Sequence, residues 1–131
     1  MALQVTALQQ SSFPGVDAGQ FIDYLFFGVV AAGNYVTGGD VLNFSGASPL
    51  LTTGQPPVGP VTIQSQSAAA GHSGYQYYYR PGNPSTQSNG RMQVLTTGTG
   101  SGQPMVELAA GAYPVAITSD TIVGSAGFPR A

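Results

Sequence analysis

The chain has 131 residues, which is the size of one domain and long enough to bury a core without a metal ion or a disulfide. It contains no cysteine, which excludes disulfides, thiolate metal sites and thiol catalysis. With three arginines, no lysine and a net charge of −2, it lacks the basic surface that phosphate binding requires, so nucleic acid is not expected as a partner. So few charges suit a protein that stays in contact with other proteins better than a free monomer.

Residues 1–16, which contain Phe-Pro-Gly at 13–15, are predicted to form an extended N-terminal arm with an edge strand at 3–8, ahead of a single β domain at 17–131. The arm has no basic flank followed by an apolar segment, so export through a signal peptide is not expected. The most apolar stretch, FIDYLFFGVVAAG at 21–33, is too short to span a membrane and contains Asp23. A buried helix is the alternative here, but the β-branched and aromatic residues favour a strand.

Glycine and proline interrupt the rest of the chain so often that short strands and turns are expected. A turn at 38–40 precedes a strand at 41–44. The segment 55–60 contains three prolines and is predicted to be a stiff extended connection. The next segment, VTIQSQ, alternates and places Val61 and Ile63 on one face.

YQYYYR and RMQVLTT are predicted to pair as a hairpin with a long loop whose turn lies at Asn89 and Gly90. The C-terminal part adds strands at 105–118, with Val106 and Leu108 on one face and Val115 and Ile117 on another, and a last strand around TIVGSAGF. Seven to nine short strands predict an all-β fold, namely a small antiparallel β-sandwich or barrel.

The sequence offers no combination of residues typical of an active site. His72 is the only histidine, and no glycine-flanked serine has the G-x-S-x-G spacing of a nucleophile elbow. Asp40 and Asp120 lie in turns, where aspartate usually bonds its own backbone. We therefore expect no catalytic residue, no cofactor and no metal ion, although a calcium site built from distant loops stays open as an alternative.

Four tyrosines lie within residues 75–79. In a strand Tyr75, Tyr77 and Tyr79 share one face, and Tyr78 lies on the other face with Gln76. The shared face could be a sugar-binding platform, a sheet interior or a subunit interface. The candidates for protein contacts are Leu3, Val5, Leu8, Phe13, Pro56, Pro57, Tyr75, Tyr77, Tyr79, Arg80 and Asn83.

The stretches LFFGVVAAGNYVTGGDVLNFSG, GYQYYYRPGNPSTQSNGRMQVLTTG and ELAAGAYPVAITSDTIVGSAGF together resemble the small head proteins of tailed bacteriophages, over roughly residues 20–128. Arg91 and Met92 stand where that pattern usually has lysine and leucine. The resemblance implies a capsid decoration, or cement, protein: a non-enzymatic β domain that binds the major capsid protein on the outside of the virion as a homotrimer, made in the host cytoplasm.

Two other classes of function stay open. One is a β module that binds carbohydrate or a host surface, and the other is a minor head or tail structural protein. An enzyme is the least favoured class, and no membrane association is expected.

Overall fold

The computed structural model describes residues 3–14, 21–45, 55–66, 74–96 and 104–129, with the backbone alone for 9–14 and 21. The fold is predominantly β, and its strand pairs are antiparallel, as predicted. Sheet I contains, in spatial order, β1 (Leu3–Pro14), β2 (Phe21–Ala31), β10 (Ile122–Pro129) and β5 (Val58–Ser65). Sheet II contains, in spatial order, β4 (Asp40–Leu42), β7 (Gly90–Thr96) and β6 (Tyr75–Arg80), and β8 (Val106–Glu107) also pairs with β7.

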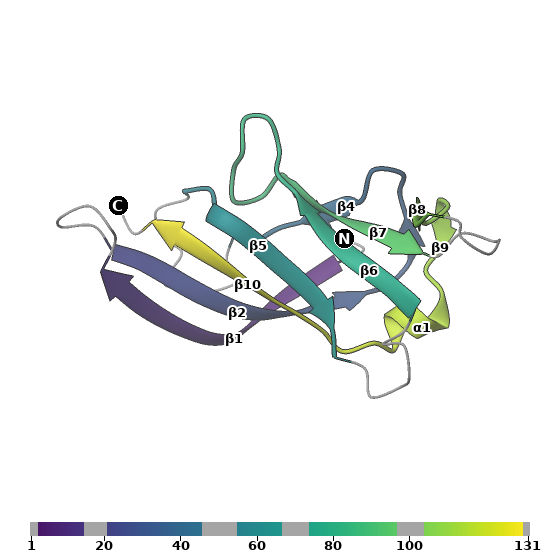
Figure 1. The fold of residues 1–131 in the computed structure, drawn as a ribbon, viewed down its shortest axis with the longest axis horizontal. Helices are drawn as coiled ribbons and strands as arrows, with labels where there is room; N and C mark the ends of the chain where they lie inside the picture. Colours follow the sequence, from purple (N-terminus) through teal and green to yellow (C-terminus); the bar gives the residue numbers. More distant parts are fainter. Residues whose placement is uncertain (1–2, 15–20, 46–54, 67–73, 97–103, 130–131) are drawn as a thin grey trace.

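Two small elements complete the described chain. A two-stranded sheet joins β3 (Asn34–Tyr35) to β9 (Gly111–Ala112), and α1 (Val115–Thr118) is a single helical turn. Figure 1 shows β5 and β6 running side by side, where an edge of sheet I meets an edge of sheet II. The prediction of a small β-sandwich is confirmed.

Strand β2 is the centre of sheet I, which confirms the strand interpretation of residues 21–31 over the helical one. Leu25, Phe27 and Val29 point into the core, whereas Tyr24 and Phe26 point outward. A helix would have gathered the apolar residues at spacings of three and four, but burial here alternates with the period of two that a strand imposes.

Residues 3–14 are extended, as expected, but they form an edge strand and not a free arm. β1 pairs with β2 from Leu3, opposite Ala31, to Pro14, opposite Phe21, with a bulge between Ala7 and Gln9. Leu3 is buried in the core. The edge strand predicted at 3–8 is therefore confirmed and continues to residue 14.

The core lies between the two sheets and is rich in aromatic side chains. Phe27 and Phe128 from sheet I both meet Phe44, which follows β4, with ring centroids 5.0 Å and 5.2 Å away in edge-to-face geometry. Gly124 of β10 makes this packing possible. A Cβ there would lie 2.4 Å from a backbone oxygen of β5 and 2.5 Å from Cζ of Phe27.

The segment after Pro114 was predicted to be a strand and is instead α1. Backbone N–H groups of residues 117, 118 and 119 donate to the carbonyls of Pro114 and Val115. Ile117 is buried while Val115 is 78% exposed, so the two residues do not share a face. A separation of two residues places side chains on nearly opposite sides of a helix, which explains the error. The predicted common face of Val106 and Leu108 is wrong as well, since Val106 is exposed and Leu108 packs against the core.

The predicted hairpin is confirmed, because β6 pairs with β7 from Tyr75 opposite Thr96 to Arg80 opposite Arg91. The turn position was wrong, since Gly90 is already the first residue of β7 and pairs with Leu42. The proline-rich segment runs directly into β5. Its pairing with β10 is irregular beside Pro60, which fits an edge strand whose prolines cannot donate hydrogen bonds.

Candidate interaction surface

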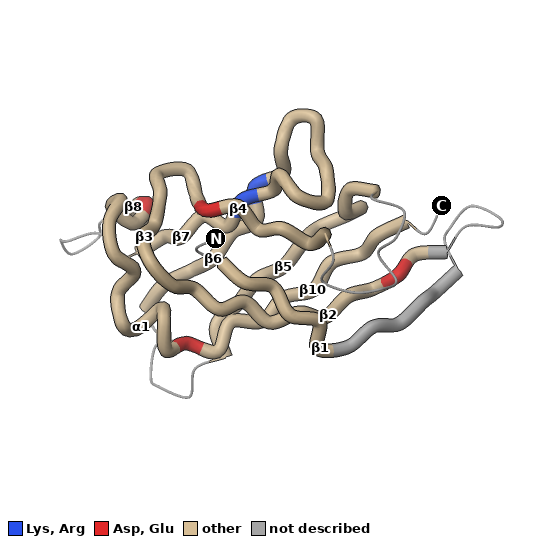
Figure 2. Tube along the Cα trace, turned by 180° about the vertical axis from the view of Figure 1, so that it is seen from behind, with Lys and Arg blue, Asp and Glu red and all other residues tan. Residues whose placement is uncertain are grey.

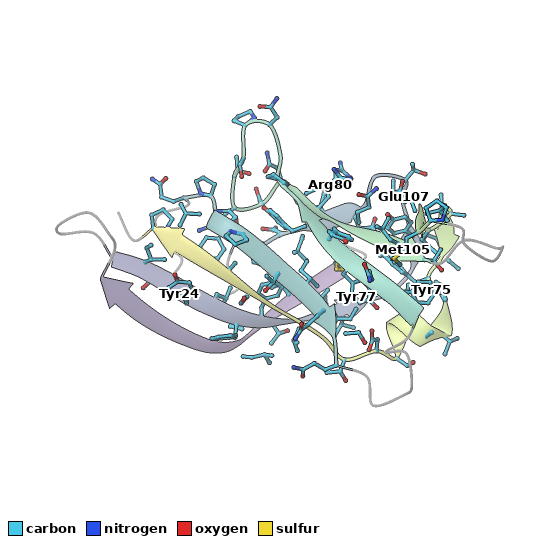
Figure 3. The ribbon with its side chains drawn as sticks, in the orientation of Figure 1. Tyr24, Tyr75, Tyr77, Arg80, Met105 and Glu107 are labelled. Carbon is cyan, nitrogen blue, oxygen red and sulfur yellow. The ribbon has the colours of Figure 1, made fainter. Side chains whose placement is uncertain are left out.

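The tyrosine row on β6 lines the interior of the sandwich. Tyr77 is 5% exposed, and Tyr75 and Tyr79 are half-buried and pack against the core. The Tyr77 hydroxyl donates to Oδ2 of Asp120 at 2.8 Å, and Ser65 Oγ donates to Oδ1 of the same carboxylate at 2.7 Å. Figure 3 shows Tyr75 and Tyr77 on the strand facing β5. Of the three interpretations of this row, the sheet interior is the one that the burial supports.

A second tyrosine holds Glu107 of β8. The Tyr35 hydroxyl donates to Oε2 of Glu107 at 2.7 Å, and the Gly38 N–H donates to the same oxygen at 2.6 Å. The hydroxyl also accepts the Val94 N–H at 3.2 Å. Burial raises the pKa of Tyr35 to about 12, and the hydrogen bond from Tyr35 lowers the pKa of Glu107.

A third tyrosine, Tyr113, donates to Oδ2 of Asp40, and both residues are buried. Burial, with this hydrogen bond, raises the pKa of Tyr113. The sequence predicts that Asp40 and Asp120 accept hydrogen bonds from the backbone of their own turns. Their carboxylates instead accept hydrogen bonds from tyrosines distant in sequence, which gives them a structural role.

Within the described ranges, no three histidine, aspartate or glutamate side chains come together as they would to hold a metal ion. None of the helices described is long and apolar enough to cross a membrane. His72 lies outside the described residues.

The loop at 81–89 projects from the body of the domain between β6 and β7 (Figure 1). Asn89 braces it, because its side chain accepts the Thr86 N–H at 2.8 Å and donates to the Pro84 carbonyl at 2.7 Å. Gln87 anchors it to the core side, since its carbonyl accepts the Phe44 N–H at 2.9 Å. Asn83 is exposed on this loop.

The outward surface of sheet I carries no charge and exposes a group of apolar side chains. We define the outer face of sheet I by Leu8, Tyr24, Phe26, Val30 and Val123. The first four are 41% to 60% exposed. In the described part of sheet I the single residue charged at neutral pH is Asp23, and it points inward and is buried.

A shallow groove of about 460 Å³ runs along β10 on this outer face. Its lining includes Val123 and Ser125 of β10, Leu8 and Phe26, and polar residues of β5. Thr62 Oγ1 and Ser125 Oγ are hydrogen-bonded at 2.8 Å across the strands.

The outward surface of sheet II carries the charge instead. Arg80 and Arg91 are directly opposite one another and exposed. Nε of Arg80 donates to Gln93 at 2.7 Å and Nη1 of Arg91 donates to the Gly39 carbonyl at 2.8 Å, so the two guanidinium groups bind different acceptors. Figure 2 shows the basic positions beside an acidic one at β4 and a further acidic one at β8, whereas other acidic positions lie near α1 and on β2.

The predicted contact residues do not form one surface in the folded protein. Leu3 and Tyr77 are buried within the domain, which excludes them from a contact surface. The half-buried ones are Val5, Pro56, Pro57, Tyr75 and Tyr79, and the exposed ones are Leu8, Arg80 and Asn83. Phe13 pairs with Ile22 in sheet I.

The exposed aromatics of β2 were missed. Their signal was available in residues 21–31, where apolar residues occupy both faces of the alternation and one face has to point outward.

Comparison with protein-family models, with curated proteins and with solved structures finds no match to this chain. The resemblance to phage head proteins therefore stays a prediction.

Proposed function

We propose that this chain is a non-enzymatic structural protein of a phage virion, which binds the outside of the head as a homotrimer and cements neighbouring subunits of the major capsid protein. The observation that carries the proposal is the outer face of sheet I, where apolar and aromatic side chains are exposed without any charge. An exposed group of apolar side chains of this kind is typical of a protein–protein contact.

The area of the outer face of sheet I indicates that one copy of the protein binds its partner weakly. Four strands about 4.8 Å apart and about eight residues long give a projected area of roughly 500 Å². Burying it against a partner removes about twice that area in total, roughly 1,000 Å², which is at the lower end for specific interfaces. Three linked copies gain affinity because the later contacts become intramolecular.

The distribution of charge suggests an orientation. Sheet I faces the capsid, because its outer face can be removed from water without desolvating a charged group. Sheet II, with Arg80 and Arg91, stays in solvent. The braced loop at 81–89 is a further contact point, because its conformation is already fixed and ordering it costs little entropy on binding.

The first test is the copy number in particles of a phage that encodes the chain. A stained gel is expected to show hundreds of copies per particle. A band at a few copies per particle would instead indicate a minor head or tail protein and would refute the cement function.

The second test is cosedimentation with heads that lack the protein. Phe26→Asp places a charge in the outer face of sheet I and is expected to reduce binding at least tenfold. Val115→Asp is the matched control, because it makes the same kind of change at an exposed apolar residue on α1. Thermal unfolding of both variants checks that they fold. Equal binding by the two variants would show that the outer face of sheet I does not contact the capsid.

A further inference from the structure

The edges of the two sheets face one another across a cleft of about 780 Å³. Its walls are residues 63–66 of β5 and residues 75–78 of β6. In the described pairing, β5 joins β10 alone and β6 joins β7 alone, so no strand ladder bridges the cleft. The volume falls within the roughly 300–1,000 Å³ of small-molecule sites.

The side chains that line this cleft are almost all polar and none is charged. Three are glutamines, at 64, 66 and 76, three are tyrosines, at 75, 77 and 78, and the others are Ser65 and Ile63. Each amide supplies both a hydrogen-bond donor and an acceptor, and each hydroxyl can do either. The cleft therefore presents many neutral hydrogen-bonding groups beside aromatic rings.

We propose that this cleft binds a neutral saccharide. An anion would find no cationic side chain among the lining residues, and the carboxylate next to them, that of Asp120, already accepts hydrogen bonds from Ser65 and Tyr77. A purely apolar ligand would leave amides desolvated without partners, at a cost of about 1–3 kcal/mol each. A sugar satisfies both halves of the lining, because its hydroxyls match the amides and its C–H faces pack on aromatic rings.

Tyr78 and Gln76 are the residues best placed to make these contacts. Tyr78 is 49% exposed, and its hydroxyl lies 3.3 Å from Oε1 of Gln76, which orients the ring beside the amide. Tyr77 forms the floor, where its hydroxyl is held by Asp120. This site differs from the tyrosine platform that the sequence suggested, because it uses the outward side chains of β6 as well as the inward row.

The inference does not depend on attachment to a capsid. Gln64 and Gln66 line both the cleft and the groove on the outer face of sheet I, but Gln76 and Tyr78 line the cleft alone, so a variant at either of these two positions separates the two activities.

The test uses a printed array of neutral glycans and of glycans that contain sialic or uronic acid, followed by calorimetry with the strongest neutral oligosaccharide. The purified full-length chain is expected to bind neutral glycans with a Kd below about 1 mM. Gln76→Ala and Tyr78→Ala should each weaken that binding at least tenfold, and Tyr78→Phe should retain most of it because the ring remains.

Gln4→Ala is the matched control, since Gln4 is an exposed glutamine on β1, away from the cleft, and it should bind as the unaltered chain does. Three results would each overturn the proposal: no binding to any neutral glycan, binding to acidic glycans alone, or equal affinities for Gln76→Ala and Gln4→Ala. Circular dichroism spectra confirm that every variant is folded before its binding is compared.

Discussion

Replacing Tyr35 by phenylalanine tests whether the tyrosine–carboxylate pairs stabilise the sandwich. The change removes one oxygen and leaves the ring, which packs edge-on against Tyr113 with ring centroids 5.8 Å apart. Two hydrogen bonds disappear with that oxygen, the one donated to Glu107 and the one accepted from the Val94 N–H. Glu107 is near the surface and keeps the Gly38 N–H, whereas the bond to Val94 is buried.

The loss of the hydrogen bond from the Val94 N–H therefore dominates the change in the free energy of unfolding. Leaving a buried N–H without an acceptor costs about 1–3 kcal/mol. We expect Tyr35→Phe to lower the free energy of unfolding by about 2 kcal/mol, which in a domain of this size lowers Tm by roughly 6–10 °C.

Urea unfolding followed by far-UV circular dichroism measures this loss. Tyr78→Phe is the control, because its hydroxyl is exposed and its removal should change stability by less than about 0.5 kcal/mol. If Tyr35→Phe is as stable as Tyr78→Phe, the reasoning about the buried hydroxyl is wrong.

The same variant changes the response to acid. The pKa of Glu107 is lowered in the folded state, first by Tyr35, so its contribution to stability is present above about pH 4.5 and is lost as the pH falls through the lowered value. Tyr35→Phe removes the largest cause of that shift. Its stability should therefore depend less on pH in this window than that of the unaltered chain, and an unchanged slope would contradict the assignment.

Three further changes follow from burial and backbone geometry. Burial raises the pKa of Tyr35 to about 12, so the unfolded chain loses this proton at a lower pH than the folded chain does. The urea concentration at the unfolding midpoint should therefore decrease as the pH rises from about 10 to about 12, and a constant midpoint would contradict this. Gly39→Ala should cost more than about 2 kcal/mol in urea unfolding, since φ is +102° and the new Cβ would lie 2.6 Å from a backbone oxygen of β7. Gly33→Ala, at φ +75° with open space around it, is the control and should cost about 1 kcal/mol. Gly124→Ala should overpack the core and cost about 1–3 kcal/mol, whereas Gly28→Ala, whose nearest neighbour would be 3.7 Å away, should be tolerated; equal thermal stabilities would refute this.

The fold class was accessible from the sequence because alternation and turn residues are local signals. Residues 21–31 and 75–80 have the composition and the period of two that strands require, and both are strands. α1 was missed because one helical turn is too short to show a period, and Val115 and Ile117 satisfy the strand pattern equally well.

The direction in which each strand faces was harder to predict. On β6 both faces carry tyrosine, and tyrosine suits a core and a wet surface alike, so composition does not distinguish them. The partner of each buried tyrosine was also beyond local reasoning, since Tyr35 and Glu107 are separated by 72 residues. The outer face of sheet I and the cleft between β5 and β6 both arise from tertiary packing, which places residues of separate strands side by side.

The tyrosine–carboxylate pairs also have an optical consequence. The chain has seven tyrosines and no tryptophan, so tyrosine alone provides its intrinsic fluorescence. A carboxylate that accepts the phenolic proton quenches tyrosine emission, and the hydroxyls of Tyr35, Tyr77 and Tyr113 are each held in this way. These three tyrosines are therefore expected to emit weakly in the folded protein and to brighten when the sandwich opens, so its unfolding can be followed without a label.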